Sequence, residues 1–290
     1  MLPVFERAYA KLNITLDVLG KRPDGYHDLD MIMQTVTLSD TLSVRRGVGE
    51  GIRVLSNLGY LPCDERNIAY TAANAFYRHT GHTCDGLSIV IEKRIPVAAG
   101  MAGGSADGAA VLRALNRIYE TGLSLDELAV IGKEVGADVP YCIHGGTMRA
   151  RGIGEKLDKL PEIPHCYFLL CKPQFGMSTA RVFGGLDCST ITVRPDTEAV
   201  IEALGQQDLL KIARSLSNVL EDVVAREHAE IRHLRRIMME CGALGACMSG
   251  SGSTVFGIFD SKAHAEAGYA RLKKRHKDTY LTEPKGAQDE

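Results

Sequence analysis

The stretch Pro96-Val97-Ala98-Ala99-Gly100-Met101-Ala102-Gly103-Gly104-Ser105-Ala106-Asp107 decides how this chain folds around its site. It follows a short apolar run at residues 87–91, which is typical of a buried strand. It leads into residues 109–119, where alanine, leucine and valine recur at helical spacing. A loop of small residues between a strand and a helix N-terminus is a favourable place for backbone amides to bind phosphate.

Glycine lets backbone N–H groups come close to phosphate oxygens, and the first-turn amides of a helix have no partner inside it. Gly100, Gly103 and Gly104 would allow this approach, and Ser105 would add a hydroxyl. The loop is not a Walker A loop, since no lysine follows Gly104. It is not a dinucleotide-binding loop either, since the glycine spacing G-x-G-x-x-G is absent. Two alternatives stay open: the glycines serve packing in a tight turn, and Ser105 is an ordinary N-cap.

Outside this loop, the clearest pattern is the alternation of apolar and polar side chains at residues 10–19, which predicts a half-buried strand. Lys11 and Asn13 then lie side by side on the polar face. That face is either solvated or part of a site, and the strand alone favours the first.

A strong turn signal, Pro-Asp-Gly at residues 23–25, places Tyr26 and His27 just beyond a turn. Residues 31–44 are again strand-like, with an expected break at Ser39-Asp40. The turn is therefore expected to present Tyr26 and His27, with more strand following it.

Further along, residues 67–79 predict a helix. Ser124 and Glu127 have the spacing of a capping box at the start of another helix, and Gly136 is expected to end it. The charged tail from Lys273 onward is expected to fray.

Composition narrows the classes of function. The 290 residues include 34 Lys and Arg against 36 Asp and Glu, a formal net charge of −2, and no tryptophan, so no nucleic-acid partner is expected. The eight cysteines are scattered without a C-x-x-C pair and no signal peptide is recognisable, which predicts free thiols and a cytoplasmic location. No apolar run approaches the roughly 20 residues of a membrane helix, so no membrane partner is expected. The spacing of His79, His82 and Cys84 matches no zinc site, and no protein-ligated metal is expected.

Taken together, these segments resemble the GHMP kinase superfamily, whose phosphate loop reads P-x-x-x-G-L-x-x-S-S-A. Met101 replaces the more usual leucine, a swap that conserves volume. Within the superfamily, the signatures of the 4-diphosphocytidyl-2-C-methyl-D-erythritol kinases are similar to residues 10–16 (AKLNITL), 22–29 (RPDGYHDL), 136–140 (GADVP), 152–155 (GIGE) and 249–254 (SGSGST). The resemblance extends over about residues 6–260.

This resemblance implies an α+β fold of two domains: an N-terminal α+β ATP-binding domain at residues 1–160 and a C-terminal ferredoxin-like domain at 161–290, with a cleft between them. It implies that ATP, accompanied by Mg²⁺, phosphorylates the 2-hydroxyl of 4-diphosphocytidyl-2-C-methyl-D-erythritol in the non-mevalonate (MEP) route to isoprenoid precursors. The alternatives are a mevalonate or homoserine kinase, and a nucleotide-binding protein without catalysis. A monomer or weak homodimer is expected.

In the family, the positions that match Lys11 and Asp138 form the catalytic pair. The carboxylate would accept the proton of the attacking hydroxyl, and the ammonium would keep that carboxylate ionised. Asn13, on the same strand face as Lys11, would help position the acceptor. For Asp138 the alternative is an N-cap of a short helix that begins near Pro140.

The resemblance also assigns binding residues. Tyr26 and His27 match the cytosine pocket, or else pack as turn residues on the sheet. Thr179 and Phe183 lie in a segment that matches the part closing over the base, and Phe183 has core burial as its alternative. Asn67 matches a position near the adenine.

For the phosphates, the resemblance assigns ATP to the loop at residues 96–106, with Ser105 as the hydroxyl nearest Mg²⁺. The loop at residues 249–252 either donates backbone N–H groups to the substrate diphosphate or is a structural turn. The sequence favours neither.

Overall fold

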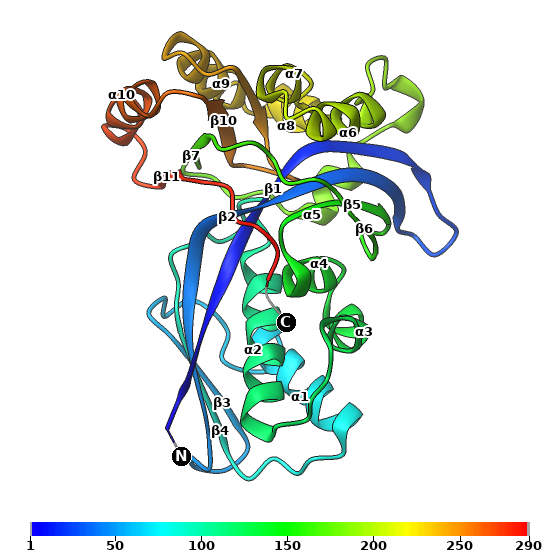
Figure 1. Cartoon of the computed structure of the whole chain (residues 1–290), viewed down its shortest axis with the longest axis vertical. Coiled ribbons are helices and arrows are strands. Elements are labelled where there is room, and N and C mark those ends of the chain that lie inside the picture. The colour runs from blue at the N-terminus through cyan, green and yellow to red at the C-terminus, as the bar shows by residue number, and fades with distance from the viewer. Residues whose placement is uncertain (1, 289–290) are drawn as a thin grey trace.

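Residues 2–288 are described by a computed structural model, in which two β-sheets carry helices packed against them (Figure 1). The larger sheet has seven strands in the order β3-β4-β2-β1-β8, with β5 and β6 extending it from β2. These strands are β1 (Val4–Lys21), β2 (His27–Arg46), β3 (Ile52–Ser56), β4 (Leu87–Glu92), β5 (Thr147–Gly152), β6 (Lys156–Lys159) and β8 (Ser217–Asn218). On one side of its long strands lie the helices α1 (Ile68–Thr80), α2 (Gly103–Tyr119), α3 (Leu125–Val135) and α4 (Val139–His144) (Figure 1).

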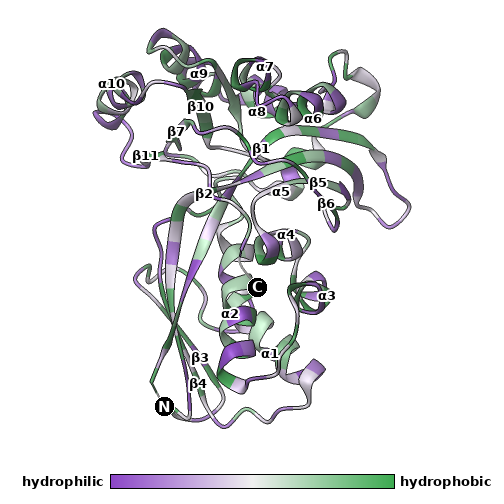
Figure 2. Cartoon of the chain, in the orientation of Figure 1, coloured by the Kyte–Doolittle hydropathy of each residue, from purple (hydrophilic) through white to green (hydrophobic). Residues whose placement is uncertain are grey.

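The smaller sheet has the order β11-β7-β10-β9 and is antiparallel throughout. Its strands are β7 (Tyr167–Cys171), β9 (Gly245–Met248), β10 (Val255–Phe259) and β11 (Thr279–Thr282). The helical elements of this half are α5 (Thr179–Gly184), η1 (Cys188–Thr190), α6 (Thr197–Gly205), α7 (Leu209–Arg214), α8 (Glu221–Glu227), α9 (Glu230–Glu240) and α10 (Lys262–Lys273). In Figure 2 the buried strand β10 is green, whereas the outer helix α10 mixes purple with green. The mixture of helices and strands in both halves confirms the predicted α+β class.

The predicted N-terminal strand is confirmed and is longer than expected, because β1 runs from Val4 to Lys21. Its apolar face carries Leu12 and Ile14, which belong to one buried cluster with Phe168 and Phe256 of the smaller sheet. The opposite face, with Lys11, is also buried. The interpretation of that face as solvated is therefore wrong: the helices and the cleft cover it.

The second strand does not break at Ser39-Asp40, contrary to expectation, since β2 is continuous from His27 to Arg46. Asp40 is fully buried, and its Oδ1 accepts hydrogen bonds from the backbone N–H groups of Arg94 (2.5 Å) and Ile95 (2.8 Å). A polar residue that reads as a strand breaker can stay inside a sheet when its carboxylate has such partners.

The helix predictions are confirmed at their ends. Asn67 is the N-cap of α1, and its side chain accepts a hydrogen bond from the N–H of Ala69. Ser124 and Glu127 make both hydrogen bonds of the capping box of α3, and Gly136 is the C-cap. These local signals depend only on neighbouring residues, which is why the sequence contains them.

The tail does not fray as predicted within the residues that the structure describes. Strand β11 pairs with β7, and the following residues cross to the other half of the molecule, where the N–H of Lys285 donates to the carbonyl of Thr35 (2.9 Å). The N–H of Gln288 donates to the carbonyl of His144 at the end of α4 (2.7 Å). Figure 1 shows this red segment lying across β2 toward α4, so the tail is a strap that joins the two halves.

Candidate active site

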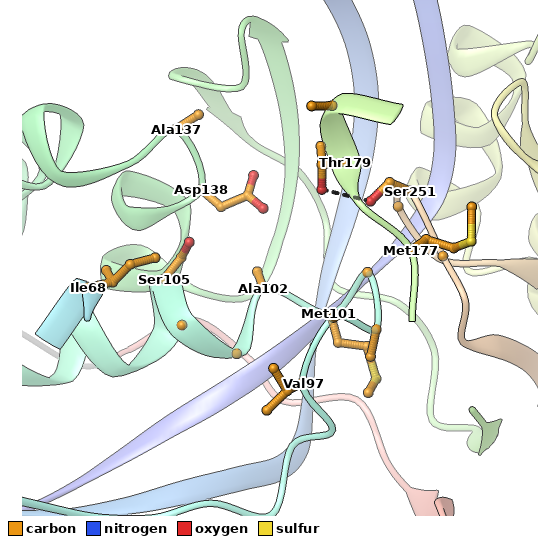
Figure 3. Close-up of a pocket in the computed structure, with 18 of the residues that line it drawn as sticks. Ile68, Val97, Met101, Ala102, Ser105, Ala137, Asp138, Met177, Thr179 and Ser251 are labelled. Carbon is orange, nitrogen blue, oxygen red and sulfur yellow. Dashed lines mark hydrogen bonds between the residues drawn. The ribbon is translucent and has the colours of Figure 1, made fainter. Parts of the chain in front are cut away.

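A cavity of about 960 Å³ lies where the two sheets meet. Its wall comes from five segments far apart in the sequence, at residues 21–31, 61–68, 93–107, 177–184 and 250–252, together with Lys11, Leu16, Ala137, Asp138 and Ile153. Figure 3 shows the start of α2 on one side and the segments of Thr179 and Ser251 on the other. The cavity therefore collects the predicted phosphate loop, the hairpin turn and the C-terminal loop in one place.

The phosphate loop ends where α2 begins, at Gly103. The first backbone hydrogen bond of the helix runs from the N–H of Ala106 to the carbonyl of Ala102 (2.9 Å). The N–H groups of Gly103, Gly104 and Ser105 precede that bond and have no acceptor four residues back in the helix, and all three residues line the cavity. The helix start is thus aimed at the cavity as an anion site requires.

The glycines of this loop have a packing role that the sequence left as an alternative. A Cβ on Gly100 would lie 2.1 Å from the carbonyl oxygen of Ser249, and one on Gly103 would lie 3.0 Å from Cγ2 of Ile95. A Cβ on Gly104 would come within 3.2 Å of Cδ1 of Ile68. Gly100 therefore needs to be glycine, because a side chain there would overlap the backbone of Ser249, whereas Gly103 and Gly104 are in tight contact with the side chains of Ile95 and Ile68.

Ser105 is not the N-cap of α2. That position belongs to Ala102, which has a left-handed backbone (φ 55°) and makes no side-chain capping bond. In Figure 3 the hydroxyl of Ser105 points toward the same part of the cavity as the carboxylate of Asp138. Its hydroxyl therefore faces the cavity and does not cap the helix as an N-cap would.

Lys11 and Asp138 are far apart in the sequence but lie next to each other in the cavity wall. Lys11 Nζ lies 3.8 Å from Asp138 Oδ2, and the side chains are 6% and 31% exposed. Asp138 occupies the N-cap position of α4, but its side chain makes no capping hydrogen bond. The capping alternative is wrong for the side chain, which is free to meet a ligand.

Asn13 supports Lys11 from within the protein. Lys11 Nζ donates to Asn13 Oδ1 (2.6 Å), and the backbone N–H of Asn13 donates to the hydroxyl of Ser249 (3.3 Å). Asn13 is fully buried and does not line the cavity, so any help it gives in positioning the acceptor would act through Lys11. The oxygen of Asn13 fixes the lysine ammonium beside Asp138.

At the far end of the cavity, Tyr26, His27, Thr179 and Phe183 all contribute to the wall. The rings of His27 and Phe183 lie 5.2 Å apart between centroids, inclined by 35°, and Tyr26 is 60% exposed. Thr179 Oγ1 is 3.0 Å from the hydroxyl of Ser251. The two rings therefore contact each other directly, and a flat base could stack on an outer face of this pair but not between its members.

Asn67 also lines the cavity, next to Ile68 and Pro62. Its side chain is engaged in the protein, because Nδ2 donates to the carbonyl of Pro62 (2.8 Å) while Oδ1 caps α1. Any contact of Asn67 with an adenine would therefore compete with these bonds.

The sequence did not point to a buried ionic cluster at the base of the phosphate loop. Lys93 Nζ donates to Asp40 Oδ2 (2.5 Å) and to Asp107 Oδ2 (2.6 Å), and all three side chains are nearly inaccessible. Burial raises the pKa of Asp107 to about 7, against the opposing effect of the Lys93 ammonium. Burial lowers the pKa of Lys93, but the two carboxylates outweigh it and the pKa of Lys93 is raised. The one available signal was the charged run at residues 92–94, directly before the loop.

Two findings bear on metals and membranes. Among residues 2–288, no three His, Cys, Asp or Glu side chains gather in a way that could hold a metal ion. Within the same residues, no helix combines the length and the apolar character needed to cross a bilayer.

Family models match both halves of the chain. The GHMP kinases N terminal domain matches residues 67–146, and the GHMP kinases C terminal domain matches residues 200–278. The chain is 44% identical to a 4-diphosphocytidyl-2-C-methyl-D-erythritol kinase of Clostridium kluyveri, over 95% of this chain and 98% of that one. It is 46% identical to the enzyme of the same name from Exiguobacterium sibiricum, with 97% of each chain covered.

Solved structures give the same picture. A crystal structure of a 4-(cytidine 5'-diphospho)-2C-methyl-D-erythritol kinase is 31% identical, with a TM-score of 0.83 and coverage of 98% of this chain and 100% of that one. A homoserine kinase from Cytophaga hutchinsonii has a TM-score of 0.79 over 100% of this chain and 96% of that one, but it is only 19% identical, so it shows a shared fold alone.

Proposed function

The chain belongs to the 4-diphosphocytidyl-2-C-methyl-D-erythritol kinases of the GHMP kinase family, and on that premise we propose how its own residues carry out the phosphoryl transfer. It is an ATP-dependent kinase that phosphorylates 4-diphosphocytidyl-2-C-methyl-D-erythritol in the MEP route to isoprenoid precursors. The reacting hydroxyl in our proposal is the one on carbon 2 of the erythritol.

The observation that carries the mechanism is the Lys11–Asp138 pair beside the start of α2. Asp138 has no other task, since its side chain neither caps α4 nor is fully buried. We assign it as the group that accepts the proton of the attacking hydroxyl. The ammonium of Lys11, held by Asn13, lies 3.8 Å from that carboxylate and would offset the negative charge that develops on the acceptor oxygen.

The phosphates of ATP are assigned to the N–H groups of Gly103, Gly104 and Ser105. These donors are fixed before the nucleotide arrives, so they can stabilise charge on the transferring group without rearranging. The γ-phosphoryl group would then lie between the start of α2 and Asp138, which share one part of the cavity in Figure 3.

Mg²⁺ fits this site as a partner of the nucleotide. It prefers hard oxygen ligands and keeps several waters, so a hydroxyl and the phosphates suffice without a cage of carboxylates. Ser105 is the side chain that we propose as its protein ligand, because its hydroxyl faces the cavity at the helix start. When bound, the ion would neutralise phosphate charge.

We assign the cytosine of the substrate to the cavity face of the paired His27 and Phe183 rings, with Tyr26 in the same wall. Aromatic rings there can stack on a base, and the imidazole can donate to or accept from a pyrimidine edge. Mevalonate and homoserine carry no base, so this end of the cavity would contribute nothing to binding them. That difference separates the proposal from the alternative acceptors.

Three further points stay proposals. A cytoplasmic location is supported by the eight cysteines, which are all free. We keep a monomer or weak homodimer as the expected assembly, and a division into domains near residue 160.

Product analysis tests the site of transfer. After turnover with ATP and Mg²⁺, ³¹P and ¹³C NMR of the product should show one new phosphate ester at carbon 2, together with one ADP per product. A phosphate ester at another hydroxyl would overturn the proposed placement of the acceptor beside Asp138.

A further inference from the structure

The buried cluster of Lys93, Asp40 and Asp107 lies directly beneath the phosphate loop, and no step of the mechanism above uses it. The Lys93 side chain is 4% exposed, and those of Asp40 and Asp107 are 0% and 6% exposed. Buried charges in this arrangement are costly unless each is paired, so their presence calls for a physical account.

The first end of the loop is fixed through Asp40 and Asn57. Asp40 Oδ1 accepts the N–H groups of Arg94 and Ile95, the two residues before Pro96. Asn57 binds both backbone groups of Lys93: its Oδ1 accepts from the N–H (2.8 Å) and its Nδ2 donates to the carbonyl (3.2 Å). The backbone that leads into the loop is therefore held at three consecutive residues.

The second end is fixed through the Lys93 side chain. Its ammonium donates to Asp107 Oδ2 (2.6 Å) in the first turns of α2 and lies 3.4 Å from the carbonyl oxygen of Gly103. Because the same ammonium also donates to Asp40 (2.5 Å), one side chain ties the start of the loop to its end. Residues 96–102 therefore form a loop whose two ends are held together by the Lys93 side chain.

We propose that Lys93 is a positioning residue for ATP: with Asp40 and Asp107 it closes the base of the phosphate loop and so fixes the direction of the amides at the start of α2. The inference rests on the proposed ATP site. Loop residues with left-handed backbones, Ala98 and Ala102, are held between the two tied ends. Loss of the tie would let this segment relax, and the amides would have to be ordered when the nucleotide binds.

Direct contact of Lys93 with phosphate is the rival explanation, since Lys93 lines the cavity. Its ammonium, however, already donates to two carboxylates. The rival predicts the opposite sign for one substitution: removing Asp107 would free the ammonium and take away a negative charge near the phosphates, so ATP would bind more tightly.

The test is Asp107→Leu, which removes the acceptor at the second end of the loop and leaves Lys93 and Asp40 as a balanced pair. The Kd of a non-hydrolysable ATP analogue with Mg²⁺, measured by calorimetry, should rise about tenfold to a hundredfold, as expected for one lost charged hydrogen bond. At saturating ATP, the kcat of this variant should stay within about threefold of the parent value, because Lys11 and Asp138 do not contact Lys93, Asp40 or Asp107. Asp107→Asn keeps an acceptor of the same shape and should restore the Kd to within about threefold of the parent.

An unchanged or lower Kd in folded Asp107→Leu, checked by thermal unfolding, would overturn the proposal. If Asp107→Leu does not fold, Asp107→Ala repeats the test, because it leaves room for water beside Lys93. Loss of the fold in both would also overturn it, since the contact would then support the whole domain. A separate variant, Ala102→Asp, tests the proposed ATP site itself: if this variant binds the analogue with the parent Kd, the ATP site is wrong, whatever the result for Asp107.

Discussion

The placement of ATP at the start of α2 makes a sharp prediction for Ala102→Asp. Ala102 lines the cavity at the N-cap position with φ 55°, a left-handed backbone that aspartate and asparagine tolerate better than alanine. The new carboxylate would lie beside the amides of Gly103, Gly104 and Ser105, where the phosphates are proposed to bind. Fold stability should therefore be preserved while the site becomes negative.

The magnitude follows from Coulomb's law. A carboxylate about 6 Å from a phosphate charge, at an effective dielectric constant of roughly 20–40, opposes binding by about 1.4–2.8 kcal/mol per unit charge. The KM for ATP should thus rise about tenfold to a hundredfold, and more if the carboxylate also occupies the free amides. Higher salt should reduce the effect only partly, because the site is shielded from solvent.

The assay is a coupled ADP-release measurement over a range of ATP concentrations, with Ala102→Asn as the matched control. Asparagine has nearly the same shape and backbone tolerance but no charge, so its KM should stay within about threefold of the parent. Equal KM values for the Asp and Asn variants, in proteins with equal Tm, would refute the assignment of ATP phosphates to this helix start.

Three other variants follow from the structure. Asp138→Asn should lower kcat by roughly 10²–10⁴ with little change in ATP affinity, and steady-state kinetics would contradict the assignment by showing near-normal kcat. Phe183→Ala should raise the KM for the cytidylyl substrate about tenfold, as expected for a lost stacking contact, and not that for ATP; a matching rise for ATP would show a general packing defect instead. Truncation after Thr282 removes the backbone hydrogen bonds of the strap, in which Thr37 donates to Glu283, Lys285 donates to Thr35 and Gln288 donates to His144, so unfolding should need about 2–4 kcal/mol less free energy. Denaturant titration would detect this, and an unchanged midpoint would mean that the tail frays after all.

How far the sequence predicted the fold depends on the distance between interacting residues. The alternation around Lys11, the helical pattern from Asn67 and the capping box of Ser124 act within a few residues, and the structure confirms each as local structure. The break expected at Asp40 was wrong because its partners lie 54 and 55 positions away, at Arg94 and Ile95. No local pattern records such a partner.

The candidate site shows the same limit. The meeting of Lys11 with Asp138 came from a family resemblance, since spacing alone cannot bring two such distant residues together. The sequence left open whether the loop glycines serve phosphate or packing; the close approach of Gly100 to Ser249 shows a packing role for that glycine, and the phosphate role of the loop stays a prediction. The tie through Lys93 was missed because a lysine in a charged run usually points to solvent, and only the folded chain shows it buried.

Acceptor choice tests the central claim most directly, because it asks whether the cavity reads a cytosine at one end and activates a hydroxyl at the other. The measurement is kcat/KM for 4-diphosphocytidyl-2-C-methyl-D-erythritol, mevalonate and homoserine with the same enzyme, ATP and Mg²⁺. We expect efficient turnover of the cytidylyl substrate and negligible turnover of the other two. Equal or faster phosphorylation of mevalonate or homoserine would contradict the account.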